Sequence, residues 1–230
     1  MATATSSPAS APTLTVAQQA RRDRIIDAGL ALLNERDFDK IQVKDVAVEA
    51  SVALGTVYHY FSSKEQLFAE VLVRWAATLR TNISRNPLRG TTDAQRLTQV
   101  INRSVRAFQR QPSLARLVAT LETSTDPLAT EILARLAVTT NEIYVGAIQD
   151  VDRNTAQRIV TVVDAVLASR LRSWVAGRIS IATVTDDLTD AIGLLLDPTA
   201  DRGSRDARVE TRSTGEAPST GTASGQMARS

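Results

Sequence analysis

The sequence predicts an all-α protein of about nine helices, with a small N-terminal helical domain and a larger C-terminal helical domain. Apolar residues recur three and four positions apart over most of the chain, which is the spacing of one face of a helix. The 230 residues are 43% hydrophobic but only 4% aromatic, and much of the hydrophobic content is Ala, Leu and Val, which favours helices over strands. Ser, Thr or Asp precedes several of the apolar runs, where such residues cap helix N-termini.

The first helix is expected over residues 17–35. Its apolar stripe comprises Ile25, Ile26, Ala28, Leu32 and Leu33. Arg21, Arg22 and Arg24 stand near its start, where positive charge does not complement the helix dipole. An external anion such as a phosphate would offset this charge. An ordinary Arg-rich surface is the alternative interpretation.

Two short helices joined by a tight corner are expected next. Residues 43–50 place apolar side chains at i, i+3, i+4 and i+7, which predicts a helix of about two turns. These side chains are Val43, Val46, Ala47 and Ala50. Residues 51–53 are too few to form anything but a turn.

The second short helix, over residues 54–61, has two different sides. Val57 and Phe61 lie four positions apart and face inward, together with Tyr60. The opposite side carries Gly55, Thr56, Tyr58 and His59. A short helix that buries two apolar residues and presents a hydroxyl, a phenol and an imidazole is typical of the recognition helix in a helix-turn-helix.

This segment resembles the DNA-binding segment of TetR-type repressors. The motif G-T-x-Y-x-Y-F-x-S-K is matched by Gly55, Thr56, Tyr58, Tyr60, Phe61, Ser63 and Lys64. Two residues depart from the family pattern. Ser51 replaces the usual glycine at a corner that tends to require a positive φ, and Gln42 replaces the Ser or Thr that commonly caps the second helix.

The motif and the helical phase together predict the residues that contact DNA. They are Arg22, Gln42, Val43, Lys44, Leu54, Gly55, Thr56, Tyr58, His59, Tyr60 and Lys64. Thr56, Tyr58 and His59 are expected in the major groove, Tyr60 at its rim and Lys64 on a phosphate. An alternative for His59 is a position at the protein–DNA edge without a base contact.

The charge of this segment is a weak indicator of DNA binding. Residues 21–75 contain eight basic and nine acidic side chains, so the segment is formally −1, whereas a DNA-binding surface is normally basic. We therefore expect basic residues to line the DNA side and acidic residues to face away. The basic residues are Arg21, Arg22, Arg24, Lys44 and Lys64, and the acidic ones are Asp37, Asp39, Glu49 and Glu70. A mixed solvated surface is the alternative interpretation.

The later helices are recognised by their caps and breaks. Ser62 or Ser63 is expected to cap a long fourth helix that connects the two domains. Residues 86–90 form a break, and further helices are expected to start near Thr92, Ser113, Asp126, Asp152 and Thr183, the last with a capping box to Asp186. Pro198 ends the pattern.

Four regions follow from this organisation. Residues 1–17 are expected to be a disordered lead-in, 18–64 the helix-turn-helix domain, 65–197 a ligand-binding and dimerisation domain, and 198–230 a disordered tail. The chain has no cysteine, which excludes disulfides and thiolate chemistry. No run is apolar enough to span a membrane, and residues 1–19 lack the apolar core of a signal peptide, so a cytoplasmic protein is expected.

A fainter resemblance extends into the C-terminal domain. Residues 102–121 and 150–180 are similar to the ligand-binding half of the actinobacterial cholesterol-catabolism repressors within the TetR family. This resemblance implies repression of a lipid or steroid catabolic regulon, relieved by an acyl-CoA thioester. Arg103, Arg106 and Arg110 are then candidates to meet a CoA phosphate at the mouth of a pocket.

An effector pocket is expected among the helices of this domain, because ligand pockets in bundles are mostly apolar with a few polar groups. The predicted lining is Trp75, Thr78, Ile101, Val105, Phe108, Leu117, Leu136, Thr140, Tyr144, Val163, Leu167 and Trp174. Asn141 is a further candidate polar group. Ordinary core packing is the alternative for each apolar or aromatic member.

Paired half-sites on DNA require a two-fold dimer. The last two long helices, residues 152–177 and 183–196, are the candidates for a four-helix interface. The residues expected near it are Val162, Val166, Leu188, Ile192 and Leu195.

Two other classes of function are less consistent with the sequence. An enzyme is not supported, because the chain has one His, no Cys, no Gly-rich phosphate loop, no HExxH helix and no nucleophile elbow. Asp186 and Asp190 could share a cation, although such a pattern is far more often the solvent-exposed face of an amphipathic helix. No cofactor is expected. A helical adaptor that binds a partner through residues 152–177, without DNA binding, is the remaining alternative.

Overall fold

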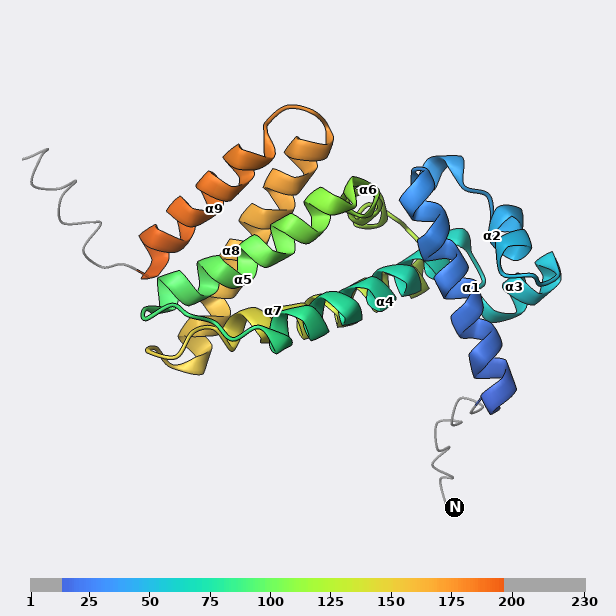
Figure 1. The fold of residues 1–230 in the computed structure, drawn as a ribbon, viewed down its shortest axis with the longest axis horizontal. Helices are drawn as coiled ribbons and strands as arrows, with labels where there is room; N and C mark the ends of the chain where they lie inside the picture. The colour runs from blue at the N-terminus through green and yellow to red at the C-terminus, as the bar shows by residue number, and fades with distance from the viewer. Residues whose placement is uncertain (1–13, 197–230) are drawn as a thin grey trace, which may run out of the picture.

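The computed structural model describes residues 14–196, and all regular structure in this range is helical (Figure 1). This confirms the all-α prediction. The helices are α1 (Val16–Glu35), η1 (a short 3₁₀ helix, Phe38–Lys40), α2 (Val43–Glu49), α3 (Leu54–Tyr60), α4 (Lys64–Arg85), α5 (Asp93–Arg110), α6 (Pro112–Leu121), α7 (Pro127–Val145), α8 (Arg153–Val175) and α9 (Ile181–Leu196). The tail expected over 198–230, and most of the lead-in expected over 1–17, lie outside this range.

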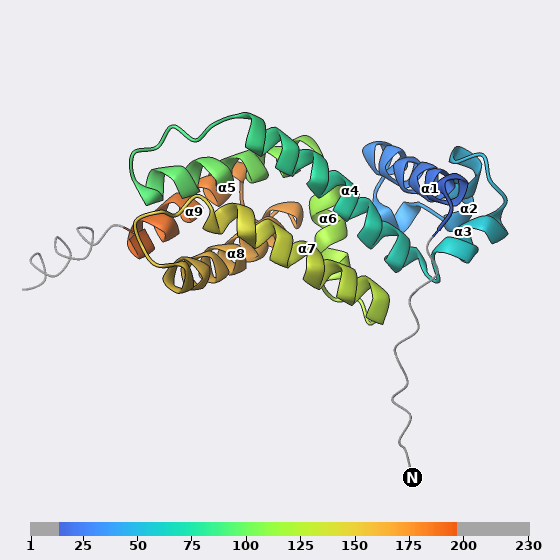
Figure 2. The same ribbon diagram turned by 90° about the horizontal axis from the view of Figure 1, so that it is seen from below.

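The N-terminal domain is formed by α1, α2 and α3 at one end of the molecule (Figures 1 and 2). Its core contains Ile25, Leu33, Val46, Val57 and Phe61, and this core continues without a break into α4, α6 and α7. The packing therefore does not stop at the end of the helix-turn-helix.

A second core lies at the other end, where α5, α8 and α9 pack together. α4 and α7 run side by side between the two ends, as both views show. Phe108 on α5 packs against both cores. The first part of α4 belongs to the N-terminal core and its far end reaches the second core, so this helix links the two ends of the molecule.

Most of the predicted helix starts are correct. Side-chain oxygens of Ser63, Thr92, Asp126 and Asp152 accept backbone N–H groups in the first turns of α4, α5, α7 and α8. α1 begins at Val16, one residue earlier than expected, because Thr15 and Gln18 form a capping box.

Two starts differ from the prediction. The last helix begins at Ile181, because the Ser180 hydroxyl accepts the Thr183 N–H at 3.0 Å. The expected capping box of Thr183 and Asp186 was therefore wrong by three residues. Pro112, expected only to end α5, is itself the first residue of α6, where its fixed φ suits a helix start.

The corner between α2 and α3 has the expected backbone. Ser51 has φ 54, which confirms that a left-handed residue is required where the family usually has glycine. The Val52 N–H then donates to the Ala47 carbonyl at 2.9 Å. Among the residues that the structure describes, no helix is long and apolar enough to cross a membrane.

Candidate nucleic-acid interface and ligand clefts

α3 exposes most of the side chains that the helical phase assigned to DNA. Val57 and Phe61 are buried in the N-terminal core. Gly55, Tyr58 and His59 are exposed, Thr56 is half-buried, and Tyr58 keeps 52% of its surface in solvent. We call Gly55, Thr56, Tyr58 and His59 the reading surface. It is a compact patch on one side of a single short helix.

Tyr60 lies beside the reading surface but is half-buried against the N-terminal core. Its ring meets the His59 ring edge-on, with 5.2 Å between centroids. Leu54, at the start of α3, is exposed. The contacts of Tyr60 and Leu54 with DNA stay predictions.

The start of α2 is capped by a side chain from its own first turn. Gln42 is the N-cap residue, and its backbone N–H donates to Asp45 Oδ2 at 2.9 Å. The Asp45 carboxylate also lies 3.6 Å from Arg36. Asp45 thus supplies an acidic group in the first turn, where negative charge is favourable, and compensates for the missing Ser or Thr. Gln42 and Lys44 are exposed beside this cap, and Val43 is half-buried.

Lys64, expected on a phosphate, makes its polar contact within the chain. Its Nζ donates to the Phe38 carbonyl at 2.6 Å and lies 3.9 Å from the centre of the Phe38 ring. Burial lowers the pKa of the Lys64 ammonium below its ordinary value, and the nearby Asp39 carboxylate opposes this effect.

Arg22 is also engaged within the protein. Its guanidinium pairs with Glu70 at 2.6 Å and lies over the Phe61 ring, 5.2 Å from its centre. Arg21 and Arg24, on the same helix, are exposed and form no ion pair within residues 14–196. They are better placed than Arg22 to meet an external anion.

Ion pairs account for much of the acidic charge in the N-terminal domain. Arg74 pairs with Asp23 and Asp27, and Arg116 pairs with Asp37. The near-neutral charge of the segment is therefore compatible with a DNA-facing side on which Lys44 and nearby arginines stand exposed.

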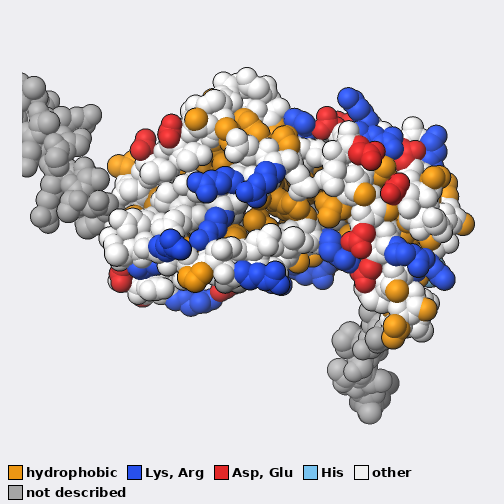
Figure 3. Space-filling model, in the orientation of Figure 1, with side chains coloured by type: hydrophobic (Ala, Val, Ile, Leu, Met, Phe, Trp, Pro, Cys, Tyr) orange, Lys and Arg blue, Asp and Glu red, His pale blue; other side chains and the backbone are white. Residues whose placement is uncertain are grey.

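The C-terminal domain has a large cleft between α4 and α5, which we call the α4–α5 cleft. Its volume is about 630 Å³. Its lining includes the predicted Trp75 and Thr78, with Arg103, Arg106 and Arg110. Figure 3 shows basic side chains next to hydrophobic surface on the side of the molecule where α4 and α5 face the viewer. An apolar wall with a basic edge suits an amphiphilic anion.

A second opening, the α4–α7 cleft, lies between these helices and the start of α1. Its volume is about 420 Å³. It contains the predicted Leu136 and Thr140, together with Arg22, Glu70 and Arg135. Each cleft therefore contains two of the twelve predicted pocket residues.

The remaining predicted pocket residues lie on neither cleft. Ile101, Val105, Leu117, Tyr144, Val163 and Leu167 are buried in the two cores, and Phe108 and Trp174 are half-buried against them. The Tyr144 hydroxyl donates to Ser104 Oγ at 3.0 Å, and burial raises its pKa to about 12. For these eight residues the alternative of ordinary core packing describes what the structure shows.

The predicted dimer residues also separate into two groups. Leu188 and Ile192 are wholly buried within the protomer, so they fill the core of the C-terminal domain and present no surface to a partner. Val162 is 48% exposed and Leu195 is also exposed, while Val166 is half-buried. Leu194, which was not among the predicted residues, is 75% exposed. The run of leucines at 194–196 covers more than one helix face and could have indicated it.

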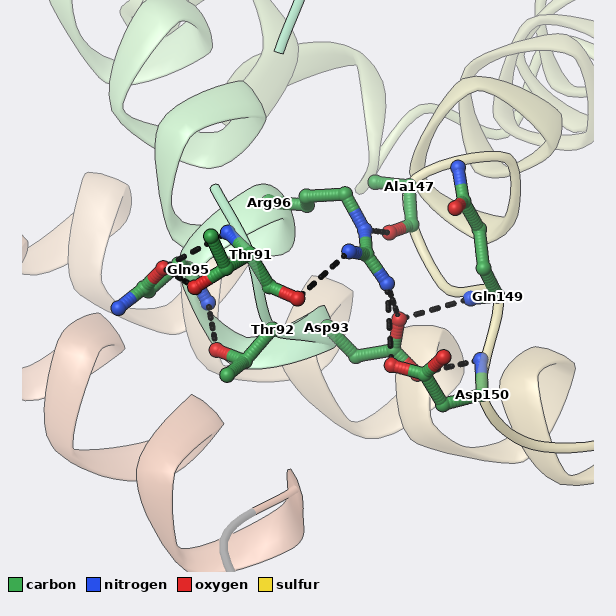
Figure 4. A network of polar contacts seen from close by, with 8 residues as sticks. All are labelled: Thr91, Thr92, Asp93, Gln95, Arg96, Ala147, Gln149 and Asp150. Atoms are coloured by element: carbon green, nitrogen blue, oxygen red, sulfur yellow. Dashed lines mark hydrogen bonds and ion pairs between the residues drawn. The ribbon is translucent and has the colours of Figure 1, made fainter. Parts of the chain in front are cut away.

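A buried polar cluster lies at the end of the C-terminal domain farthest from α3 (Figure 4). Asp93 accepts the backbone N–H groups of Gln149 and Asp150 at 2.8 and 2.9 Å and also accepts from Arg96. Arg96 donates in addition to the Ala147 carbonyl at 3.0 Å. The cluster satisfies its own polar groups and joins the start of α5 to the α7–α8 loop, so it is a structural element.

Within residues 14–196, no group of three or more His, Cys, Asp or Glu side chains could hold a metal ion. Asp186 and Asp190 are both exposed on α9, as expected for the wet face of an amphipathic helix.

Comparison with known proteins agrees with this arrangement. A family model described as "Bacterial regulatory proteins, tetR family" matches residues 25–71, and one described as "Tetracyclin repressor-like, C-terminal domain" matches residues 90–195. The HTH-type transcriptional repressor KstR of Mycolicibacterium smegmatis is 32% identical over 181 residues, or 78% of this chain and 89% of that relative. KstR of Mycobacterium tuberculosis is 30% identical over 181 residues, or 78% and 82%.

Solved structures share the fold. A TetR transcriptional regulator from Rhodococcus sp. RHA1 aligns with a TM-score of 0.70 at 23% identity, covering 79% of this chain and 98% of that one. FadR from Bacillus subtilis, in complex with stearoyl-CoA, aligns with a TM-score of 0.53 at 19% identity, covering 76% and 97%. The motif, the helix-turn-helix and the relatives all lead to one conclusion: the chain belongs to the TetR family, and it is a DNA-binding transcriptional regulator rather than an enzyme.

Proposed function

We propose that the protein is a dimeric repressor that leaves a palindromic operator when a small apolar effector binds in its C-terminal domain. The observation that carries this proposal is the pairing of an exposed reading surface on α3 with an apolar, arginine-edged cleft on α4, the helix that follows α3 directly. Operator DNA lies in the cytoplasm of a bacterium, and we expect the protein there.

The reading surface is proposed to enter the major groove. Thr56, Tyr58 and His59 supply a hydroxyl, a phenol and an imidazole, which can hydrogen-bond to base edges. Lys44, exposed at the start of α2, is proposed to contact a phosphate. Such contacts position a protein on DNA without reading its sequence.

A test of the reading surface compares Tyr58→Ala and His59→Ala with Val138→Ala, an equally simple truncation of an exposed residue on α7. Genomic fragments are first screened by gel retardation to find the operator. Each good base contact is worth about 1–3 kcal/mol, so the two α3 variants should bind the operator about tenfold or more weakly and the α7 variant normally. If all three variants bound alike, the assignment would be wrong. If the wild-type protein retarded no fragment, the helical adaptor would become the better proposal.

Dimerisation is proposed through α8 and α9. Dimerisation and ligand binding are typical of the family, and two half-sites about 34–36 Å apart would match two helix-turn-helix units. Val162, Leu194 and Leu195 expose apolar surface on these two helices. Val166, beside Val162, belongs to the same surface.

The effector is proposed to be a lipid or steroid acyl-CoA thioester, and the regulated genes to serve lipid catabolism. The resemblance of the C-terminal domain to the cholesterol-catabolism repressors supports this class, and FadR with the same fold was crystallised with stearoyl-CoA. The α4–α5 cleft offers Trp75 and Leu79 for an apolar chain and the exposed Arg106 and Arg110 for phosphates. The Arg103 guanidinium, in contrast, donates to the backbone carbonyls of Ile83, Asn86 and Pro87. The effector must bind the form released from DNA more tightly than the bound form, because equal affinity would shift nothing.

The experiment that tests the effector class is a titration of the protein–operator complex, followed by fluorescence anisotropy. Stearoyl-CoA and a steroid-CoA are compared with free CoA and with a small organic cation. Release by either thioester, but not by CoA alone, is expected. Release only by the cation would overturn the lipid proposal and leave the repressor proposal intact. A double variant, Arg106→Gln with Arg110→Gln, should raise the thioester concentration needed for release without changing operator affinity.

A further inference from the structure

We infer that Lys64 is a positioning residue for the recognition helix, and that it acts through Phe38 rather than by contacting DNA phosphate. The inference concerns the DNA-binding activity of the family and does not depend on the identity of the effector. It changes the role that the motif alone suggested for this lysine.

Both groups that contact the Lys64 ammonium belong to a single residue, Phe38. Its Nζ donates to the Phe38 carbonyl oxygen at 2.6 Å and lies 3.9 Å from the centre of the Phe38 ring. Phe38 itself is buried, and its ring packs edge-on against Phe68 with 5.2 Å between centroids. The ammonium therefore has both a hydrogen-bond acceptor and an aromatic face.

The Phe38 carbonyl also holds the turn of η1 together. It accepts the Ile41 N–H at 3.1 Å, which is the bond that closes this short helix. A carbonyl oxygen has two lone pairs, and Lys64 uses the remaining one. Lys64 thus stabilises the same oxygen that defines the conformation of residues 38–41.

This contact joins the two ends of the helix-turn-helix. η1 ends one residue before Ile41, and Gln42 then caps α2. Lys64 is the first residue of α4, four positions after Tyr60 ends α3. A single contact therefore fixes the entry into α2 relative to the exit from α3, and with it the angle at which the reading surface is presented.

A phosphate contact would require Lys64 to leave this site. The Phe38 carbonyl would lose a charge-assisted hydrogen bond, and the Phe38 ring would lose its cation. Lys44 has no such contact in residues 14–196 and is exposed on α2. It is the matched control, because it offers the same ammonium group without an internal partner.

The test uses Lys64→Met and Lys44→Met in the full-length protein, with the best operator fragment and a non-operator duplex of the same length. Affinity for both duplexes is measured over a salt series, and thermal unfolding is measured without DNA. For Lys64→Met we expect operator affinity to fall about tenfold with an unchanged salt slope. The ratio of operator to non-operator affinity should fall, and Tm should fall by about 2–4 °C.

For Lys44→Met, the salt slope should decrease by about one unit for both duplexes, with Tm unchanged. Phosphate contacts do not read sequence, so the operator preference should be kept. The same pattern in Lys64→Met would overturn the inference. A lower Tm with unchanged operator preference in the folded variant would also overturn it, because Lys64 would then only stabilise the fold.

Lys64→Arg keeps the test decisive if Lys64→Met fails to fold. A planar guanidinium cannot reproduce a compact ammonium between a carbonyl and a ring, but it binds a phosphate well. Positioning through Phe38 predicts a loss of operator preference in Lys64→Arg. A phosphate contact predicts normal affinity and preference. Thermal unfolding is measured without DNA. It therefore shows whether the Lys64–Phe38 contact stabilises the fold even if the operator assay fails.

Discussion

Arg116 on α6 donates from Nε to the Asp37 carboxylate at 2.8 Å, and Asp37 is the residue that immediately precedes η1. Two further contacts join the same surfaces. Ser113 Oγ donates to the Leu33 carbonyl at 2.6 Å, and Gln111 donates to Asn34 at 2.6 Å. The C-terminal domain therefore reaches the helix-turn-helix by a second route, through α6, in addition to the continuous helix α4.

Arg116→Met tests whether this second route carries the effector signal. The ion pair is largely exposed, and such pairs contribute about 0–1 kcal/mol, so stability and operator affinity should change little. The effector concentration for half-release should rise, because displacement of α6 would no longer act on Asp37. Arg153→Met is the control, since it removes an ion pair with Glu142 at the opposite end of the molecule. Equal release curves for both variants would exclude a role for Arg116.

Ser51→Gly should stabilise the protein. The left-handed conformation of Ser51, with φ 54, costs a non-glycine residue about 1 kcal/mol, and glycine removes this cost. Ser51→Ala is the control, because alanine keeps the Cβ that disfavours a left-handed conformation. Urea unfolding should show a higher midpoint for Ser51→Gly and no increase for Ser51→Ala. A midpoint for Ser51→Gly at or below that of the wild type contradicts the prediction.

Val162→Arg and Ile192→Arg should have different effects, although both lie on the proposed dimerisation helices. Val162 is largely exposed, so its variant should fold and sediment as a monomer with weak operator binding. Ile192 has no exposed surface, and an unpaired buried charge is strongly destabilising, so its variant should lose helical circular dichroism. Sedimentation velocity of the wild-type protein at micromolar concentration provides the reference. A dimeric Val162→Arg variant would place the interface elsewhere.

Asp93 should contribute to stability in a pH-dependent way. Burial alone would raise the pKa of the Asp93 carboxyl, but the N–H groups of Gln149 and Asp150, together with Arg96, outweigh burial and lower it below its ordinary 3.8. Because the folded-state pKa is the lower one, this contribution is complete above pH 3.8 and is lost as pH falls through the folded-state value.

The corresponding variant is Asp93→Asn. Removal of one partner from a buried ion pair costs about 3–5 kcal/mol, so Tm should fall substantially at pH 7. The difference from wild type should become smaller below about pH 4. Asp150→Asn, at the exposed edge of the same cluster, should change Tm little. Equal effects of the two variants, or a difference independent of pH, would contradict this account.

The local features of this fold were accessible from the sequence, whereas those that depend on packing between distant segments were not. The reading surface follows from the 3.6-residue period of a single helix, and the caps at Ser63, Thr92, Asp126 and Asp152 follow from local hydrogen bonding. The contact of Lys64 with Phe38 could not be predicted, because the two residues lie 26 positions apart in the sequence.

The dependence on packing between distant segments also explains why the sequence could not separate pocket and interface residues from core residues. Tyr144 and Ile192 lie on apolar stripes that look alike whether the stripe faces a core, a cleft or a second chain. Only the arrangement of α5, α7, α8 and α9 separates these environments. The exposure of Leu194 likewise depends on which side of α9 meets α5 and α8.

The cluster of Asp93 and Arg96 has a mechanical consequence. It pins the start of α5 to the α7–α8 loop at the end of the molecule most distant from α3 (Figures 1 and 4). A helix held at one end is displaced less there than at its free end. An effector that separates α4 from α5 is therefore expected to displace α5 least at the Asp93–Arg96 cluster and most at the end next to α6, which is the helix that contacts α1 and Asp37.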